Sequence, residues 1–228
     1  MKRYLAAAFL ILAALTARAQ DNTPIVFDLP DAFVDIDTLP QQKKFKPMHM
    51  IGVKYSYDLC TVQATPDIGQ GYIGSAKNFY VAYTYYHDLW DYLNIFGLQI
   101  GAKFGEQGYS SEYNDWGERT KYIEIPFLTQ LHLDAGKMRF LIDLGPYYCY
   151  KLGTDKPDGF DRFDIRHDYG IIGGGGLALV FKPFEIQVEG QYKYSLCSMY
   201  HTNKYSDLYW VLAYPRNIMI SAGIFFHL

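Results

Sequence analysis

Eight segments between His49 and Leu228 alternate apolar residues with polar or small ones over long runs. In the first segment, Ile51 and Val53 alternate with Gly52 and Lys54. An apolar residue at every second position is typical of a β-strand with one apolar and one polar face. The runs cover residues 51–59, 79–85, 96–104, 123–133, 139–151, 168–181, 185–194 and 217–228. They predict eight strands of about ten to fourteen residues each.

The length of these strands and the connections between them favour a membrane over water. Soluble sheets usually use strands of about five or six residues, whereas crossing a bilayer at a tilt takes roughly nine to eleven. The short connections are His87–Tyr92, Asp134–Lys137 and Lys182–Pro183. The long, polar connections are Thr61–Gly74, Glu106–Arg119, Gly153–His167 and Met199–Tyr214. Short and long connections therefore alternate, as in outer-membrane barrels, whereas a soluble lipocalin-like barrel has no reason to gather its long loops at one end.

We therefore expect an all-β, eight-stranded, antiparallel, up-and-down transmembrane β-barrel over residues 49–228. Its short turns would face the periplasm and its long loops the cell exterior. The composition agrees, because 50% of the residues are hydrophobic and 22 are tyrosine, yet no long apolar run follows the N-terminal region. Aromatic residues are expected in two interfacial belts. The outer belt would hold Tyr55, Tyr57, Phe104, Tyr148, Tyr150, Tyr169, Tyr192 and Tyr194, and the inner belt Tyr85, Trp90, Phe96, Phe181, Phe184 and Phe226.

The N-terminal residues predict export from the cytoplasm. Lys2 and Arg3 precede the apolar run Tyr4–Leu15, and the small-x-small sequence Ala17-Arg18-Ala19 follows. This is the pattern of a cleaved signal peptide at residues 1–19, and the apolar core is too short for a spanning helix. Residues 20–48 carry four prolines and no sustained period, so we expect an irregular periplasmic arm, either a plain linker or a plug or partner-binding strand. The expected location is the cell outer membrane.

The polar face of the strands is expected to fill the barrel lumen. It carries Lys54, Asp58, Lys103, Glu124, Arg139, Asp143, Lys151, Glu185, Glu189 and Lys193. The pair Glu185 and Glu189 could suggest acid–base catalysis, but opposite charges that neutralise each other in a polar interior explain it better. A turn at Lys182–Pro183 would place Glu189 opposite Gly176 and Gln191 opposite Gly174. Because eight strands leave room only for side chains, we expect a plugged lumen rather than a small-solute porin.

An enzyme is the alternative to a structural or interaction role. A lipid-A-modifying esterase or acyltransferase needs a serine beside a histidine on the lipid-facing wall. The nearest candidates are His201, within Tyr200-His201-Thr202-Asn203, and Ser195 and Ser198. No serine stands two residues after His201, so the sequence predicts no catalytic residues. It also predicts no cofactor-binding and no metal-binding residues, and the net charge of −3 argues against nucleic acid as a partner.

Two further expectations concern cysteine and proline. Cys60, Cys149 and Cys197 are placed inward near the outer rim on the first, fifth and seventh strands, too far apart for a disulfide between strand bodies. A turn at Asp134–Lys137 would place Pro126 opposite Gly145 and Ile125 opposite Pro146. Proline cannot donate a hydrogen bond to the ladder, so we expect a local gap or bulge shared by the two strands.

Three segments carry a resemblance to a known family. Residues 122–128 (YIEIPFL), 168–176 (DYGIIGGGG) and 189–195 (EGQYKYS) resemble the PorT-like outer-membrane β-barrel proteins. The resemblance extends over His49–Leu228 and implies a barrel, and some members of that family are tied to a protein secretion machinery. The alternating residues from Ile220 to Leu228 resemble a C-terminal barrel signal, although that signal more often ends in an aromatic residue. The expected partners are outer-membrane lipid and lipopolysaccharide, the barrel-assembly machinery through the C-terminal strand, and secretion-apparatus proteins.

Overall fold

The structure is a computed structural model that describes residues 47–67, 69–89, 93–111, 117–204 and 210–228. The expected signal peptide, nearly all of the expected arm and Trp90 lie outside the described residues. The chain divides into two units, Met1–Lys43 and Lys44–Leu228, and every described residue belongs to the second.

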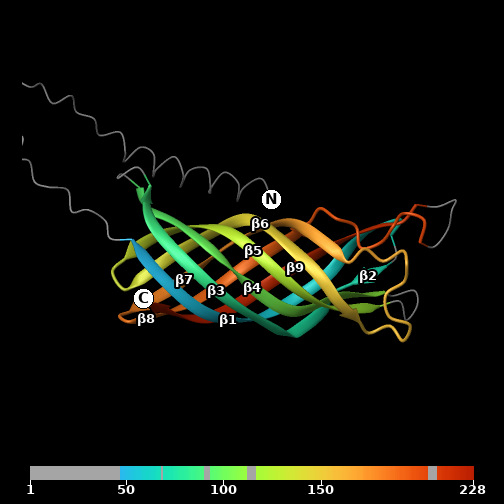
Figure 1. Cartoon of the computed structure of the whole chain (residues 1–228), viewed down its shortest axis with the longest axis horizontal. Helices are drawn as coiled ribbons and strands as arrows, with labels where there is room; N and C mark the ends of the chain where they lie inside the picture. Colours follow the sequence, from blue (N-terminus) through green and yellow to red (C-terminus); the bar gives the residue numbers. More distant parts are fainter. Residues whose placement is uncertain (1–46, 68, 90–92, 112–116, 205–209) are drawn as a thin grey trace, which may run out of the picture. The chain divides into compact units, whose positions relative to one another are not determined.

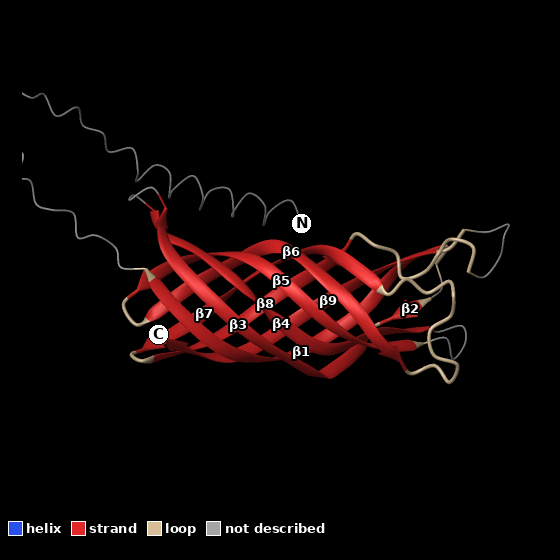
Figure 2. Cartoon of the chain, in the orientation of Figure 1, coloured by secondary structure: helices blue, strands red, loops and turns tan. Residues whose placement is uncertain are grey.

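The second unit is built from antiparallel β-strands (Figures 1 and 2). The strands are β1 (Met48–Thr65), β2 (Gln70–Gly71), β3 (Ile73–Leu89), β4 (Leu93–Ser111), β5 (Glu118–Ala135), β6 (Met138–Thr154), β7 (His167–Phe181), β8 (Phe184–Ser195) and β9 (Leu212–His227). The two-residue strand β2 pairs only with the end of β4. The other eight strands pair in the order β4-β3-β1-β9-β8-β7-β6-β5, and β4 pairs with β5. They form a closed eight-stranded barrel, which confirms the predicted fold.

The barrel closes between its first and last strands. The β1–β9 ladder runs without a break from Met50 opposite His227 to Thr65 opposite Leu212. Each of the eight long strands therefore has two hydrogen-bonded neighbours, and no long edge is left unpaired among the described residues. A closed ring satisfies the backbone polar groups internally, which is the condition for a β-structure to lie in lipid.

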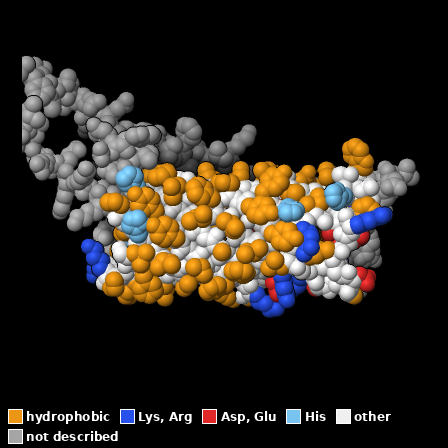
Figure 3. All heavy atoms as spheres, in the orientation of Figure 1, with side chains coloured by type: hydrophobic (Ala, Val, Ile, Leu, Met, Phe, Trp, Pro, Cys, Tyr) orange, Lys and Arg blue, Asp and Glu red, His pale blue; other side chains and the backbone are white. Residues whose placement is uncertain are grey.

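Side chains alternate between the outer wall and the lumen, as the sequence pattern predicts. Ile51 and Val53 are each 45% exposed on the outside, whereas Lys54 is 3% exposed on the inside. Figure 3 shows hydrophobic side chains spread over the visible face of the barrel wall. An apolar wall of this extent around a charged interior is stable in lipid and unfavourable in water. Among the described residues, no helix is long and apolar enough to cross a membrane.

The connections are asymmetric, also as predicted. Two short turns, Gly136–Lys137 and Lys182–Pro183, lie at one end of the barrel, and the long connections lie at the other (Figure 2). Gly136 has a φ of 69°, the left-handed conformation that lets two residues close the β5–β6 hairpin. By the rule for outer-membrane barrels, the end with long connections is the outer end.

The strands are longer than the sequence predicted. β4 has 19 residues, and β1 and β5 have 18 each, against an expected ten to fourteen. The extra residues lie mainly at the outer end. We call residues 61–65, 106–111, 118–121, 151–154 and 212–216 the outer extension. Because roughly eleven residues suffice to cross a bilayer, this part of the barrel stands beyond the membrane.

One predicted register is wrong by two residues. Pro126 faces Tyr147, and Ile125 faces Tyr148, because the β5–β6 turn has two residues rather than four. The predicted gap is nevertheless present. In the β5–β6 ladder, the pair Pro126–Tyr147 is followed by Thr129–Leu144, and the residues between them are unpaired. The β4–β5 ladder is also interrupted, between Ile100 and Lys103. By contrast, the predicted pairs Gly176–Glu189 and Gly174–Gln191 are confirmed.

Candidate functional site: a closed lumen and a capped outer mouth

The half of the lumen nearest the periplasm is filled by a network that we call the inner tier. The Lys54 ammonium donates to both carboxylate oxygens of Glu189 at 2.7 Å and to Gln99 at 3.1 Å. Gln191 donates to Glu189 and to Asp143, both at 3.1 Å. Gln130 donates to the other Asp143 oxygen at 2.8 Å, and Tyr86 donates to Gln130. Nearest the short turns, Arg139 binds Asp134 at 2.6 Å and Glu185 at 2.9 Å.

A second network, the outer tier, lies toward the outer end. Lys103 donates to Asp58 at 2.7 Å. Lys193 donates to Glu124 at 2.5 Å and to Gln107 at 3.2 Å, and its ammonium is 4.0 Å from Asp168. Lys193 is fully buried, so these carboxylates stabilise a charge that has left water.

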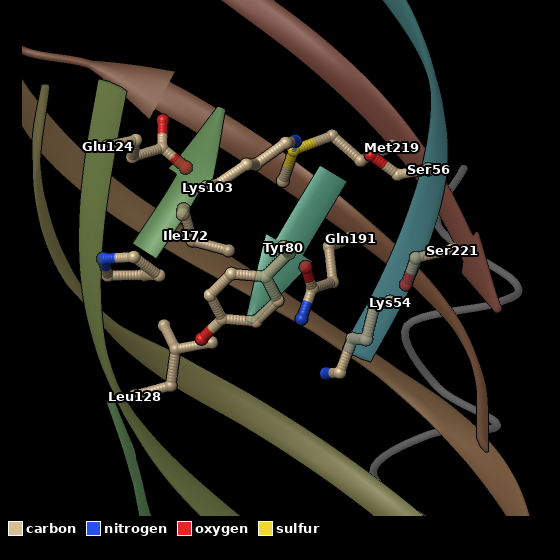
Figure 4. Close-up of a pocket in the computed structure, with 11 residues that line it drawn as sticks. Lys54, Ser56, Tyr80, Lys103, Glu124, Leu128, Ile172, Gln191, Met219 and Ser221 are labelled. Carbon is tan, nitrogen blue, oxygen red and sulfur yellow. Dashed lines mark hydrogen bonds between the residues drawn. The ribbon is translucent and has the colours of Figure 1, made fainter. Parts of the chain in front are cut away.

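Apolar side chains, which we call the collar, fill the lumen around its middle. The collar comprises Tyr122, Leu128, Tyr147, Cys149, Ile172 and Met219. A cavity of about 20 Å³ lies against it, and Figure 4 shows Lys54 of β1, Lys103 of β4, and Glu124 and Leu128 of β5 around it. The volume suits about one water molecule. The two tiers and the collar together place buried side chains across the lumen.

All ten charged residues predicted for the lumen are buried, each at most 6% exposed. Five are cations and five are anions, and three ion pairs join them in the two tiers: Lys54–Glu189, Lys103–Asp58 and Lys193–Glu124. Arg139 and Glu185 form a fourth. The cysteines are all free thiols. Cys60 and Cys149 are buried, but Cys197 lies two residues beyond β8 rather than in the strand, which corrects its predicted position.

The outer mouth is closed by a segment that we call the cap, residues 196–204. Met199 and Tyr200 are each 2% exposed and pack with Val62, Tyr109 and Ala213 inside the outer extension. The Met199 amide donates to the Ala213 carbonyl at 2.7 Å, so the cap is joined to the end of β9. The Tyr200 hydroxyl donates to Glu118 at 2.5 Å and lies 2.9 Å from the Tyr109 hydroxyl.

Two lysines form ion pairs at the barrel mouth, one between the β6–β7 loop and β5 and one between the cap and that loop. Lys156 lies 2.6 Å from Glu118, and Lys204 pairs with Asp164. Burial opposes the charge on Lys156, but the bond to Glu118 outweighs it and raises the pKa of Lys156. Burial alone would raise the pKa of Asp164, yet hydrogen bonds from Lys204 and the Asp161 amide hold that pKa below its usual value. Burial lowers the pKa of Lys204 despite its bond to Asp164, so the charges on Lys156 and Asp164 are the ones that stabilise the closed mouth.

A large open recess lies on the outer side of this mouth. Its volume is about 710 Å³, and its lining includes Tyr109, Lys156, Phe160, Arg162 and Lys204. None of these residues was singled out from the sequence, and neither was Glu118. Part of this region could have been predicted from the sequence. The alternation continues beyond Cys60 through Val62 and Ala64, which extends the first strand into the long connection.

The residues of the esterase alternative do not come together. Ser195 is 1% exposed inside the barrel, and its hydroxyl donates to Asp168. The Ser198 hydroxyl donates to the Tyr200 carbonyl at 3.0 Å. His201 is exposed, and within the described part of the chain neither serine hydroxyl is bonded to it. In the same part, no group of three or more His, Cys, Asp or Glu side chains is placed to hold a metal ion.

Comparison with known proteins gives structural likeness only. No protein-family model and no curated protein sequence matches the chain. Neisserial surface protein A is 13% identical with a TM-score of 0.49, over 77% of this chain and 96% of that one. Ail, the attachment invasion locus protein of Yersinia pestis, solved with the heparin analogue sucrose octasulfate, is 14% identical with a TM-score of 0.45, over 80% and 100%. The N-terminal β-barrel domain of Pseudomonas aeruginosa OprF is 12% identical with a TM-score of 0.44, over 78% and 97%.

The distribution of apolar and charged side chains over the barrel indicates the location of the protein in the cell. Eight strands form a closed ring, the outer wall is apolar, and the lumen is charged. Even-numbered antiparallel barrels with short turns at one end and long loops at the other are the architecture of bacterial outer membranes. The protein is an integral outer-membrane β-barrel.

Proposed function

We propose that this protein is a non-conducting outer-membrane barrel that acts through its outer surface, in envelope structure or interaction. The observation that supports this most strongly is the closed lumen. Buried ion pairs such as Lys54–Glu189 occupy the cross-section where a channel would need water. The cap then closes the same axis a second time at the outer mouth.

The outer extension supports the same proposal. β1, β4 and β5 continue beyond the length that a bilayer requires, and Met199 and Tyr200 fix the cap on them. Because a packed core already orders the cap, the cap loses less conformational entropy when a partner binds. The recess beside Phe160 and Arg162, of about 710 Å³, is a concave surface of the outer end. We place the contact with a partner there.

A component of a protein secretion apparatus is the more specific form of this proposal. Its support is the resemblance of residues 122–128, 168–176 and 189–195 to PorT-like proteins. Those residues lie in β5, β7 and β8 and form barrel wall and lumen, so they support a barrel rather than a particular partner. The proposal treats the protein as non-enzymatic. Its support against the esterase alternative is that Ser195 and Ser198 engage Asp168 and Tyr200 instead of His201.

Complementation of a deletion strain tests the proposal. One variant replaces residues 157–162 by glycine and serine, which removes the rim of the recess without touching the strands. A matched variant, Gln191→Ala, alters the lumen only. We expect the rim variant to fail and the lumen variant to complement, with small-solute uptake unchanged in both. Loss of solute uptake in the deletion strain, restored by the rim variant, would instead establish a porin.

A separate arm tests the enzyme. Lipid A is extracted from cells that carry the wild type or His201→Ala and analysed by mass spectrometry. We expect identical lipid A in both strains and in the deletion strain. A wild-type-dependent change in acyl number that His201→Ala abolishes would establish a lipid-modifying activity and contradict the proposal.

A further inference from the structure

The cavity of about 20 Å³ in the lumen lies where the inner tier and the outer tier meet. Residues of β1, β3, β4, β5, β7, β8 and β9 line it, so it lies near the barrel axis. Lys103 belongs to the outer tier and Gln191 to the inner tier, and Figure 4 shows both beside the cavity together with Ser56. The two tiers are therefore separated at this point by the space of one small molecule.

Gln191 presents an acceptor oxygen to this cavity. Its Nε2 donates to Asp143 and to Glu189, both at 3.1 Å. Ionised carboxylates only accept, so these two bonds fix which end of the amide is the nitrogen. The Oε1 atom has no hydrogen-bond partner among the described residues. Gln191 also keeps intermediate exposure, whereas Glu189 and Lys193, its inward neighbours on β8, are buried, so its exposed surface faces the cavity that it lines.

Lys103 presents a donor to the same cavity. An ammonium group has three N–H donors. The Lys103 ammonium donates to Asp58 at 2.7 Å and to the Met219 sulfur at 3.1 Å, which leaves one N–H without an acceptor among the described residues. The side chain is only 7% exposed, so bulk water does not satisfy this donor. A buried donor without a partner costs free energy.

Two serine hydroxyls complete the polar lining. Ser56 of β1 and Ser221 of β9 are register partners, and both line the cavity. Both residues are buried. Within the described part of the chain, neither hydroxyl has a hydrogen-bond partner. A hydroxyl both donates and accepts, so the serines fit an occupant of either kind.

The charges around the cavity select a neutral occupant. The charged lining residues Lys54, Lys103 and Glu124 already form ion pairs, at 2.7, 2.7 and 2.5 Å. A cation in the cavity would be repelled by Lys103, and an anion by the Gln191 oxygen and by the Glu124 Oε1 atom, which has no partner of its own. The donor from Lys103 and the acceptor from Gln191 require a molecule that accepts and donates. A water molecule meets both conditions and fits the volume.

We propose that the cavity binds one ordered water molecule that joins the two tiers. The water accepts a hydrogen bond from Lys103, donates one to Gln191 Oε1, and donates its second hydrogen to a serine hydroxyl. Ordered internal waters typically make about three such bonds. The site belongs to the lumen and involves no residue of the outer recess, so it stands or falls separately from the proposed function.

A high-resolution crystal structure of the full-length wild-type protein tests the site directly. We expect one density peak within roughly 2.7–3.2 Å of both Lys103 Nζ and Gln191 Oε1. Gln191→Leu keeps a side chain of similar length but removes the acceptor, and the peak should be lost. The matched control, Gln63→Leu, changes a glutamine that lies outside the cavity lining and should keep the peak. Absence of density from the wild type, or a peak that persists in Gln191→Leu, would overturn the site.

Exchange of the salt in the crystals separates water from an ion. Wild-type crystals are grown with bromide in place of chloride and, separately, with rubidium in place of sodium, and anomalous scattering locates either ion. We expect the peak between Lys103 and Gln191 to remain without an anomalous signal in both salts. A bromide signal there would overturn the assignment in favour of an anion, and a rubidium signal would overturn it in favour of a cation. This arm uses only the wild type, so it remains decisive if Gln191→Leu does not fold.

Discussion

The membrane-spanning part of the barrel and the outer extension use the same strands, but apolar side chains lie mainly on the outer wall in the first, whereas the second has an apolar cluster inside beside buried polar residues such as Glu118 and Lys151. In the first, Lys54 and Glu189 are buried inside while Val53 and Val188 face outward. In the second, Tyr109, Met199 and Tyr200 form an apolar core inside, and residues such as Gln63 and Lys121 are exposed outside. The backbone geometry is continuous, so the change reflects the solvent that surrounds each part. Lipid selects an apolar wall, and water selects an apolar core.

The comparison predicts the largest effect for a buried ion pair in the lumen. Lys193→Met removes the cation that Glu124 binds at 2.5 Å and leaves a buried carboxylate unpaired. We expect the free energy of unfolding to fall by about 3–5 kcal/mol. Urea titration of the refolded protein in lipid vesicles, read by the mobility of unboiled samples on gels, measures it. The double variant Lys193→Met/Glu124→Gln should recover much of the loss, and equal stability of the single and double variants would contradict the pairing.

A charge introduced on the outer wall should cost more stability in the membrane-spanning part than in the outer extension. Val188 is 52% exposed midway along β8, so Val188→Arg puts a cation in the acyl region. We expect a loss of about 2–4 kcal/mol in lipid vesicles. Thr65→Arg, at an exposed position of the outer extension, should change stability by less than about 0.5 kcal/mol. Similar losses at both positions would show that the outer extension also lies in lipid.

The apolar core under the cap should lose stability when a large side chain is truncated, as the core of a soluble protein does. Met199→Ala leaves a cavity beneath the cap and should destabilise it by roughly 2–3 kcal/mol. Because the cap is separate from the ion pairs of the lumen, proteolysis at residues 196–204 should accelerate while the global unfolding midpoint stays within error. A matching drop in global stability would show that cap and barrel unfold as one unit.

The smallest expected effect is an increase in proteolysis of the cap at low pH. The pKa of Asp164 is lowered in the folded protein, so its stabilising contribution is present above the pKa of the unfolded chain, near 4, and is lost as the pH falls through the lower folded value. Proteolysis of the cap should therefore increase below about pH 4 by less than about tenfold. Asp164→Asn should show that increase already at about pH 7. A pH profile identical for wild type and Asp164→Asn would show that Asp164 does not hold the mouth closed.

The sequence predicted the membrane-spanning part well and the outer extension poorly. Lys54, Glu189 and Lys193 were placed in the lumen because a single period of two ran from one aromatic belt to the other. Beyond the belt an outward Lys121 and an inward Tyr109 no longer match the expected faces, so Tyr109 was assigned to a loop and Lys121 to no strand. The register at Pro126 was wrong because Gly136 closes a two-residue turn, which the pattern of flanking residues does not specify.

The candidate site was harder to predict than the fold. The lumen charges follow from alternation, but the cap depends on contacts between Tyr200, Glu118 and Tyr109, which lie 82 and 91 residues apart along the chain. Local patterns carry no information about such partners.

Conductance tests the central claim, the closed lumen, most directly. Planar bilayers that contain the refolded wild-type protein are recorded in high salt, with insertion verified by the gel mobility of the recovered protein. Because the inner tier, the collar and the outer tier fill the barrel, we expect no reproducible single-channel steps. Stable steps of porin size from the wild-type protein would contradict the closed lumen, since a continuous chain of water would then have to pass between Lys54 and Lys193.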